Sequence, residues 1–357
     1  MSVIRRRNSR QWLSSWETGD ATEVGSISCR HGDNGALSSV IAPERLLGSA
    51  PRIRPGDCTT VLAELAAIVA PILVCSGIGY LWGRLDRPFE SEFLTAIVTT
   101  IGTPCLVFST LTGLESDLGD LGDMLVATLA CFAGFAAVGM TVLRAMRLPF
   151  HSYLPAVMFP NTGNMGLPLS LFAFGEKGLA LAIVVFATSA SLQFTVGVGV
   201  AAGHANLQRL LRMPLLYAVA LAILVMLLRI PVPEWVMNTT RLLGGLVIPL
   251  MLVTLGVSLS KLRIKSMGRS LVLALLRLIP GTLIGLAVGW AFGLEPVGRG
   301  VLAIQCAMPV AVFNYLFAQL YRREPEEVAG AVMLSTLISF VTLPLLLYYI
   351  LSQVAVP

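Results

Sequence analysis

Residues 159–164 read Phe-Pro-Asn-Thr-Gly-Asn and lie near the middle of an apolar stretch that extends from 152 to 175. A helix in contact with lipid must keep its backbone groups hydrogen-bonded, and proline interrupts that bonding. The opened backbone is tolerated only where it is buried in protein or lines a wet cavity. A second apolar stretch, 298–321, is interrupted in the same way at Pro309. Paired interruptions of this kind are typical of a transport site.

Apolar stretches of bilayer length fill the rest of the chain. Of its 357 residues, 55% are apolar and 13% are charged, and about 20 consecutive apolar residues suffice for a helix to cross a bilayer. We therefore predict an all-α integral membrane protein with ten transmembrane helices. Their predicted ranges are 61–83, 92–113, 124–145, 152–175, 178–202, 213–230, 235–259, 269–292, 298–321 and 327–351.

The basic residues predict the orientation of these helices. The loops after the odd-numbered helices contain twelve Lys and Arg residues, and those after the even-numbered helices contain four. Basic loops remain in the cytoplasm. We therefore predict a multi-pass protein of the cell inner (plasma) membrane with both termini outside the cytoplasm.

Residues 1–57 differ from the rest in being polar and aperiodic, which predicts a disordered extension. Their eight arginines conflict with export of the N-terminus. Three explanations are open: the extension stays cytoplasmic behind an unseen element, it is exported regardless, or the translation start is assigned too far upstream.

Three landmarks in the first half of the chain recur in the second half. The pairs are separated by 145, 149 and 147 residues: Pro104 and Pro249, Pro160 and Pro309, Thr188 and Ser335. This near-constant spacing predicts two five-helix repeats, 61–202 and 213–351. Because five is odd, the second repeat is inverted relative to the first, which brings the breaks in helices 4 and 9 together. The N-termini of the half-helices then favour an anion at the crossing.

Polar side chains around the two breaks are the candidates for substrate binding, although such groups also cap helices and bond neighbouring helices. The candidates are Asn161, Thr162, Asn164, Gln305, Asn314 and Arg277. The residues expected to form the crossover and its hinge are Pro160, Gly163, Gly166, Pro168 and Pro309. A second polar set is expected to pack helices rather than to bind: Thr103, Ser189, Ser191, Gln193, Ser335, Thr336 and Ser339.

Arg277 is the one ionisable residue deep in a predicted span. An intramembrane charge is a functional candidate by default, but Arg277 lies eight residues from Arg269 and can equally extend toward the cytoplasmic loop. No Asp or Glu falls near the middle of a span, so a carboxylate relay for proton coupling is not evident. The six cysteines and three histidines lack metal-ligand spacing, so we expect no metal and no cofactor.

The first break resembles that of a known family. Pro160-Asn161-Thr162-x-x-Met165-Gly166-x-Pro168-Leu169 resembles the broken fourth helix of the auxin efflux carrier family. Gln305-x-Ala307-Met308-Pro309 and Leu343-Pro344-Leu345 are similar to later motifs of that family. The resemblance extends over residues 61–351.

The resemblance implies that helices 1, 2, 6 and 7 form a scaffold and that helices 3–5 and 8–10 form a transport domain with elevator-like motion. It also implies a substrate site at the crossover, where Asn161 matches the family's asparagine, and small organic anions as substrates. Plant members carry auxin, whereas malate, malonate or similar carboxylates are proposed for bacterial members. The short link of about ten residues between helices 5 and 6 favours the bacterial permease type.

We thus expect a secondary-active permease of mono- or dicarboxylates, with a small organic anion and the lipid bilayer as partners, no nucleic acid, and a homodimer left open. One alternative is a sodium-coupled organic-anion symporter of the bile-acid carrier type. An ion channel is less favoured, because rings of charge and carbonyl filters are absent from the sequence. An enzyme is not expected, because the sequence has no HExxH, no GxSxG and no paired intramembrane aspartates.

Overall fold

The computed structural model describes residues 58–113, 118–202, 211–262 and 266–354. The regular elements in these ranges are helices, and the β pairing found there is one isolated bridge between Pro160 and Val310. The predicted all-helical class is therefore confirmed for the described part. Residues 1–57, for which we predict a disordered extension, lie outside it.

The helices before residue 203 include two that are interrupted by π-helical turns, here labelled η. They are α1 (Cys58–Arg84), α2 (Ser91–Ile97), η2 (Val98–Gly102), α3 (Thr103–Gly113), α4 (Leu118–Ala145), α5 (Phe150–Met158), η3 (Thr162–Gly166), α6 (Leu167–Leu192), η4 (Gln193–Gly197) and α7 (Val198–Ala202). The helices after residue 211 are α9 (Pro214–Leu227), α10 (Glu234–Gly245), α11 (Val247–Lys261), α12 (Met267–Ala291), α13 (Pro296–Cys306), α14 (Val312–Leu320) and α15 (Pro325–Val354).

Seven helical stretches in the described part are long and apolar enough to cross a membrane. They are Leu65–Arg84, Ser91–Gly113, Leu118–Ala145, Thr162–Ala202, Glu234–Lys261, Met267–Ala291 and Pro325–Gln353. The chain is thus a multi-pass membrane protein. Of the ten predicted ranges, 213–230 contains only the 14-residue α9, and 298–321 is divided into α13 and α14.

The third difference between the seven stretches and the ten predicted helices arises from Thr162 to Ala202. This stretch is 41 residues long and contains parts of two predicted helices. At Gly175 the backbone has φ 64° and ψ −156°, which is not helical. Glycine adopts positive φ without the steric cost that a Cβ imposes. The continuous run is therefore two helices that meet at Gly175, where the sequence predicts the boundary between 152–175 and 178–202.

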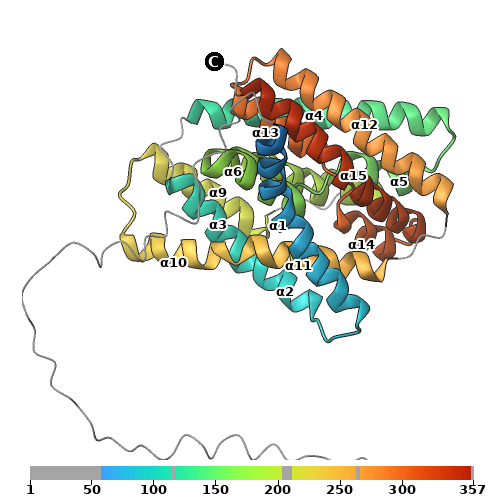
Figure 1. Ribbon diagram of the computed structural model, residues 1–357, viewed down its shortest axis with the longest axis horizontal. Helices are drawn as coiled ribbons and strands as arrows, with labels where there is room; N and C mark the ends of the chain where they lie inside the picture. Colours follow the sequence, from blue (N-terminus) through green and yellow to red (C-terminus); the bar gives the residue numbers. More distant parts are fainter. Residues whose placement is uncertain (1–57, 114–117, 203–210, 263–265, 355–357) are drawn as a thin grey trace, which may run out of the picture. The chain divides into compact units, whose positions relative to one another are not determined.

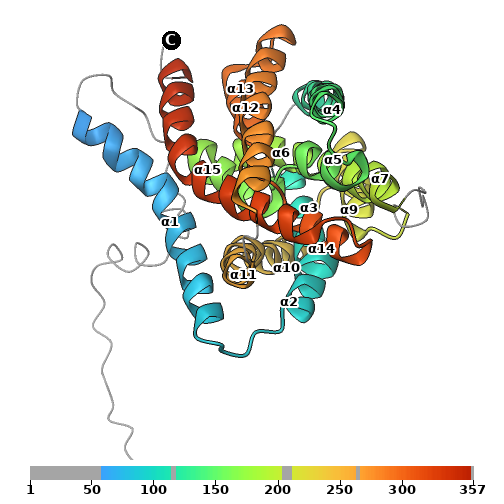
Figure 2. The same ribbon diagram turned by 90° about the vertical axis from the view of Figure 1, so that its right-hand side faces the viewer.

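The helices form two groups according to their contacts. In the first group α1 packs along α11, and α3 packs against α9 and α10. The second group contains α4–α7 and α12–α15, in which α12 contacts α4, α13 and α15. In Figures 1 and 2, α10 and α11 lie on one side, α4 and α12 lie on the opposite side, and α6 lies between them.

The contact of α1 with α11 is close because glycines lie in it. A Cβ added to Gly256 would lie 1.9 Å from Ser76 O, and one added to Gly79 would lie 2.0 Å from Val253 O. Neither backbone can move away without separating the helices. Small residues let membrane helices approach in this way.

Candidate functional site

The two interrupted helices meet where both are broken. Phe159 has the extended backbone (φ −104°, ψ 104°) that is favoured before a proline such as Pro160. Asn161 N donates to Pro309 O at 2.7 Å, and Ala311 N donates to Phe159 O at 3.1 Å. Each break thus bonds backbone groups that the other has opened. The prediction that the two breaks meet is confirmed.

Side chains of neighbouring helices complete the crossing. Asn314 Nδ2 donates to Phe159 O at 3.0 Å, and Asn314 Oδ1 accepts from Gln193 Nε2 at 2.9 Å. Ser335 Oγ accepts from Val310 N at 3.0 Å. Asn314 is a predicted substrate ligand, but its side chain is occupied in holding the crossing and does not line the cavity described below.

Gln305, another candidate, is fully buried and packs against the turn that follows the first break. Its Nε2 donates to Ser170 Oγ at 3.2 Å. A Cβ added to Gly166 would lie 2.2 Å from Gln305 Oε1, so a larger residue at this position would displace the Gln305 side chain. Gln305 does not line the cavity either.

Arg277, on α12, is 1% exposed and binds the C-terminal ends of two half-helices. Its Nη1 donates to Val157 O at 2.8 Å, near the end of α5, and its Nη2 donates to Cys306 O, at the end of α13. Its Cζ lies 4.3 Å from the centroid of the Phe135 ring. A cation is favourable at helix C-termini, where carbonyls have no helical partner. Arg277 is therefore enclosed by protein, and it is not among the described residues that line the cavity.

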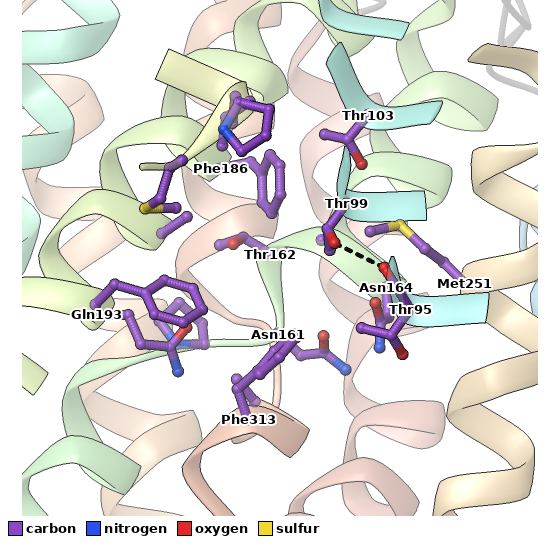
Figure 3. A pocket seen from close by; sticks show the side chains of 18 of the residues that line it. Thr95, Thr99, Thr103, Asn161, Thr162, Asn164, Phe186, Gln193, Met251 and Phe313 are labelled. Carbon is purple, nitrogen blue, oxygen red and sulfur yellow. Dashed lines mark hydrogen bonds between the residues drawn. The ribbon is translucent and has the colours of Figure 1, made fainter. Parts of the chain in front are cut away.

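A cavity of about 280 Å³ opens beside the crossing. Figure 3 shows Asn161 and Thr162 near its centre, with Thr99 and Thr103 from the first helix group on one side. Both helix groups contribute to the wall. The lining residues are Thr95, Thr99, Thr103, Pro160, Asn161, Thr162, Gly163, Asn164, Phe186, Ala190, Gln193, Phe194, Arg212, Met213, Pro214, Leu215, Met251, Ala311 and Phe313.

Two polar atoms in this wall are buried without a hydrogen-bond partner. They are Asn161 Nδ2 and Thr103 Oγ1, on residues that are 5% and 3% exposed. A buried polar group without a partner costs about 1–3 kcal/mol. Such groups are expected to form a hydrogen bond with a ligand or water when the protein is active. Both atoms are able to donate a hydrogen bond, and none of the described residues that line the cavity is acidic.

The helix ends beside the cavity are N-terminal. Asn161 precedes η3 and Ala311 precedes α14, and both line the cavity. The first N–H groups of a helix have no partner within it, and its N-terminus carries partial positive charge. The electrostatics of the cavity therefore favour an anion.

The predicted hinge residues lie at or next to the break. A Cβ added to Gly163 would lie 3.0 Å from Phe186 Cε2, so glycine keeps the cavity wall close to this ring. Pro168 lies in the first turn of α6, where the missing N–H has no bond to lose. Pro160 lines the cavity, whereas Pro309 accepts a crossover bond with its carbonyl.

The structure thus brings three of the six candidates, Asn161, Thr162 and Asn164, to one cavity. Thr103 and Gln193 also line it, although the sequence favoured a packing role for both. Arg212 also lines it, and the sequence analysis counts it only as a loop charge. Its position two residues before Pro214, where α9 begins, is the one sequence signal that this basic residue lies near a helix end.

Other residues of the second polar set donate to nearby backbone carbonyls. Ser191 Oγ and Thr336 Oγ1 each donate to a carbonyl four residues earlier, and Ser339 Oγ donates to one three residues earlier. Among the described residues, no three His, Cys, Asp or Glu side chains gather closely enough to hold a metal ion.

The second half of the chain matches a known family, and three curated proteins are similar to most of the whole chain. Residues 199–347 match the family described as "Membrane transport protein". An uncharacterized transporter of Methanocaldococcus jannaschii is 25% identical over 298 residues, covering 78% of this chain and 96% of the relative. One of Methanothermobacter thermautotrophicus is 24% identical over 307 residues, covering 81% and 97%. A Rhizobium meliloti protein named "Putative malonate transporter" is 24% identical over 313 residues, covering 82% and 97%.

Proposed function

Because the chain belongs to the auxin efflux carrier family of membrane transporters, we propose that it is a secondary-active permease of small organic anions. The anion occupies the cavity at the crossing of the two broken helices. Asn161 and Thr103 donate hydrogen bonds to its carboxylate, and Thr162 and Asn164 line the same space.

The observation that carries this proposal is the pair of buried, unpartnered polar atoms, Asn161 Nδ2 and Thr103 Oγ1, in one cavity. A carboxylate accepts hydrogen bonds from both and removes the cost of leaving them unpaired. The helix N-termini beside the cavity favour the same charge. A neutral amide brings donors of its own and gains less from these groups.

We further propose that the chain crosses the membrane ten times in two inverted repeats, 61–202 and 213–351. The two crossover bonds support this proposal, because a shift of each residue number by 150, upward in the first half and downward in the second, converts one bond into the other. Asn161 N to Pro309 O becomes Ala311 N to Phe159 O. A pseudo-two-fold axis through the bridge would relate the two bonds in this way.

Two clusters of polar side chains support the same symmetry. Lys177, at the start of the second helix in α6, lies 2.7 Å from Glu295 and 3.3 Å from Asp120, beside the starts of α13 and α4. Glu327, at the start of α15, bonds Arg269 of α12 at 3.0 Å and a tyrosine of α5. These two triplets of helices correspond to each other in the two repeats.

We propose an elevator-like motion because both helix groups contribute residues to the wall of the cavity. Thr99, Thr103 and Met251 belong to the helix group of α1–α3 and α9–α11, whereas Asn161 and Gln193 belong to the group of α4–α7 and α12–α15. Sliding of one group against the other would carry a bound anion. We also propose that the chain lies in the inner membrane, and the loop charges support an orientation with both termini outside the cytoplasm. A homodimer is compatible with this layout.

The alternative of a sodium-coupled symporter has no observation in its favour. Sodium sites are built from oxygen ligands, carboxylates among them, as hard cations prefer. The described residues that line the cavity include amides and hydroxyls but no carboxylate.

The test is a thermal-shift titration of the purified full chain in detergent against small carboxylic acids and their amides. A ligand that binds the native state at a hundred times its dissociation constant stabilises it by about 2.7 kcal/mol. We expect the acids to stabilise the protein, and Asn161→Ala and Thr103→Ala to lose this stabilisation. Asn238→Ala, an exposed asparagine on α10, is the matched control and should keep it.

Two results would contradict the proposal. Amides that stabilise the protein as strongly as the acids would remove the preference for an anion. Acid binding that survives in both Asn161→Ala and Thr103→Ala would place the anion elsewhere in the molecule.

A further inference from the structure

The cavity at the crossover has one formally charged side chain among its described lining residues, Arg212. This residue lies two positions before Pro214, at the start of α9, and is exposed. Asn161 and Thr103, in the same lining, are almost completely buried. The cavity therefore has a dry end with neutral donors and a wet end with a cation.

The wall also contains aromatic and aliphatic side chains. Phe186, Phe194, Phe313, Met251 and Leu215 all line the cavity. Apolar side chains cannot replace the hydration of a carboxylate that leaves water, and an uncompensated charge is costly in such surroundings. An anion that moves inward from the wet end thus meets a single fixed charge before it reaches the buried donors.

The protein therefore separates two tasks within one cavity. The buried donors hold an anion by hydrogen bonds that are insensitive to salt, because they lie away from solvent. An exposed cation acts over a longer range, raises the local concentration of anions and is screened by salt. A charge at the rim of a site typically changes the rate of association and its salt dependence.

We propose that Arg212 is the charge-selecting residue at the mouth of the cavity: it admits anions in preference to neutral analogues of the same shape. This inference rests on the proposed transport of an organic anion and adds to it the residue that distinguishes acid from amide at entry. It also implies that the cavity opens on the side of the protein that bears Arg212. The loop charges assign that face to the cytoplasm, so the anion enters this state of the protein from the cytoplasm.

The expected size of the effect lies between two limits. Fully exposed ion pairs change affinity by a few-fold at most, and charge-assisted bonds in dry sites change it by about tenfold to a hundredfold. Arg212 is exposed but lines the same cavity as the buried donors, so we expect Arg212→Gln to weaken acid binding roughly tenfold at low salt. Binding of the amides should stay unchanged.

The test uses malonate, propionate and phenylacetate, each with its amide, in thermal-shift titrations of the full chain at low and high NaCl. Arg212→Lys keeps the charge and should retain most of the preference for acids. Arg212→Gln should lose it, and Arg212→Glu should reverse it. The matched control is Arg144→Gln, which removes an exposed arginine from the end of α4, outside the cavity lining.

The outcomes separate this inference from the proposed function. If acids bind the wild-type protein through Asn161 but Arg212→Gln binds them equally well, or if salt leaves the difference unchanged, Arg212 does not select charge. An Arg212→Lys variant as weak as Arg212→Gln would also overturn the inference. If no acid binds the wild-type protein, the proposed function itself fails.

Discussion

The two broken helices have four ends at the crossing, and the protein treats the two kinds of end differently. At the C-terminal ends of α5 and α13, the guanidinium of Arg277 bonds the carbonyls. At the N-terminal ends, before η3 and α14, the side chains border a cavity in which Asn161 Nδ2 has no partner. The negative ends of the helix dipoles thus have a permanent internal cation, whereas no acidic side chain among the described residues lines the cavity at the positive ends.

This difference separates structure from function at one crossing. A group that belongs to the fold is expected to have its main bonds formed in the absence of a substrate, because the fold must be stable when empty. Arg277 meets this expectation through Nη1 and Nη2, although its Nε has no partner. A group that belongs to the site is expected to be partly unpaired, because its partner arrives with the substrate. Substitutions at the C-terminal ends should therefore lower the stability and leave anion binding unchanged. Substitutions at the N-terminal ends should weaken anion binding and leave the stability unchanged.

The largest effect is expected for Arg277→Met. Loss of the guanidinium leaves the carbonyls of Val157 and Cys306 without this donor in a buried site. Each carbonyl left unpaired in a buried site costs about 1–3 kcal/mol, so the loss of both bonds is expected to cost several kcal/mol. We expect a fall of this size in the free energy of unfolding, measured by thermal or denaturant unfolding in detergent, with Arg277→Lys intermediate.

A matched control for this prediction is Arg299→Met. Arg299 also stacks on an aromatic ring, with its Cζ 4.1 Å from the centroid of Trp290, but it is only half-buried. The loss should be within about 1 kcal/mol, as for an exposed cation–π contact. If Arg277→Met were as stable as Arg299→Met, the C-terminal ends would not need their cation and the comparison would fail.

A smaller loss of stability is expected for Asn314→Ala. Asn314 Nδ2 donates to Phe159 O, and Asn314 Oδ1 accepts from Gln193 Nε2. The substitution leaves Gln193 Nε2 buried without its acceptor, which costs about 1–3 kcal/mol, less any relaxation. Phe159 O keeps its bond from Ala311 N. We expect unfolding to become easier by an amount in this range, whereas acid affinity measured on the folded fraction should change little. A variant with normal stability and weak acid binding would instead make Asn314 a ligand.

The local sequence was sufficient to predict the crossing itself. Pro160 and Pro309 remove backbone donors, and a proline restricts the residue before it, so each helix must open at a known position. Asn161, Thr162 and Asn164 follow the first proline directly and were found for that reason. Their place in the cavity depends on the opened backbone, which the sequence specifies.

The roles of Gln305, Asn314 and Arg277 could not be predicted in the same way. Each lies on a regular helix, and the direction of its side chain depends on how that helix is rotated against its neighbours. Arg277 was ambiguous between site and surface, and the third solution, a bond to helix ends, requires α5 and α13 to end beside α12. That arrangement is a property of the tertiary packing.

Thr103 and Arg212 show the converse limitation, because both line the cavity but neither was identified as a site residue from the sequence. Thr103 looked like one of many small hydroxylated residues in a membrane helix, most of which bond to the preceding turn, as Thr128 does with Met124 O at 2.6 Å. Nothing in the sequence around Thr103 indicates that its hydroxyl lacks a partner. Arg212 was one of many loop charges, and only the fold places it beside the crossing.

The smallest effect on stability is expected on the N-terminal side, for Asn161→Ala and Thr103→Val. Each removes a polar atom that is buried without a partner, so no hydrogen bond within the protein is lost. We expect the free energy of unfolding without ligand to change by less than about 0.5 kcal/mol or to rise, because the cost of the unpaired atom disappears.

The measurement is ligand-free unfolding of both variants beside Asn314→Ala, followed by acid titration of the same samples. Asn161→Ala should match the wild-type protein in the first experiment and lose acid binding in the second, whereas Asn314→Ala should show the reverse. A ligand-free loss of 1–3 kcal/mol for Asn161→Ala, the range given for an unpaired buried group, would show that the N-terminal ends are also held by internal bonds. The distinction between a bonded end and an open end would then not hold at this crossing.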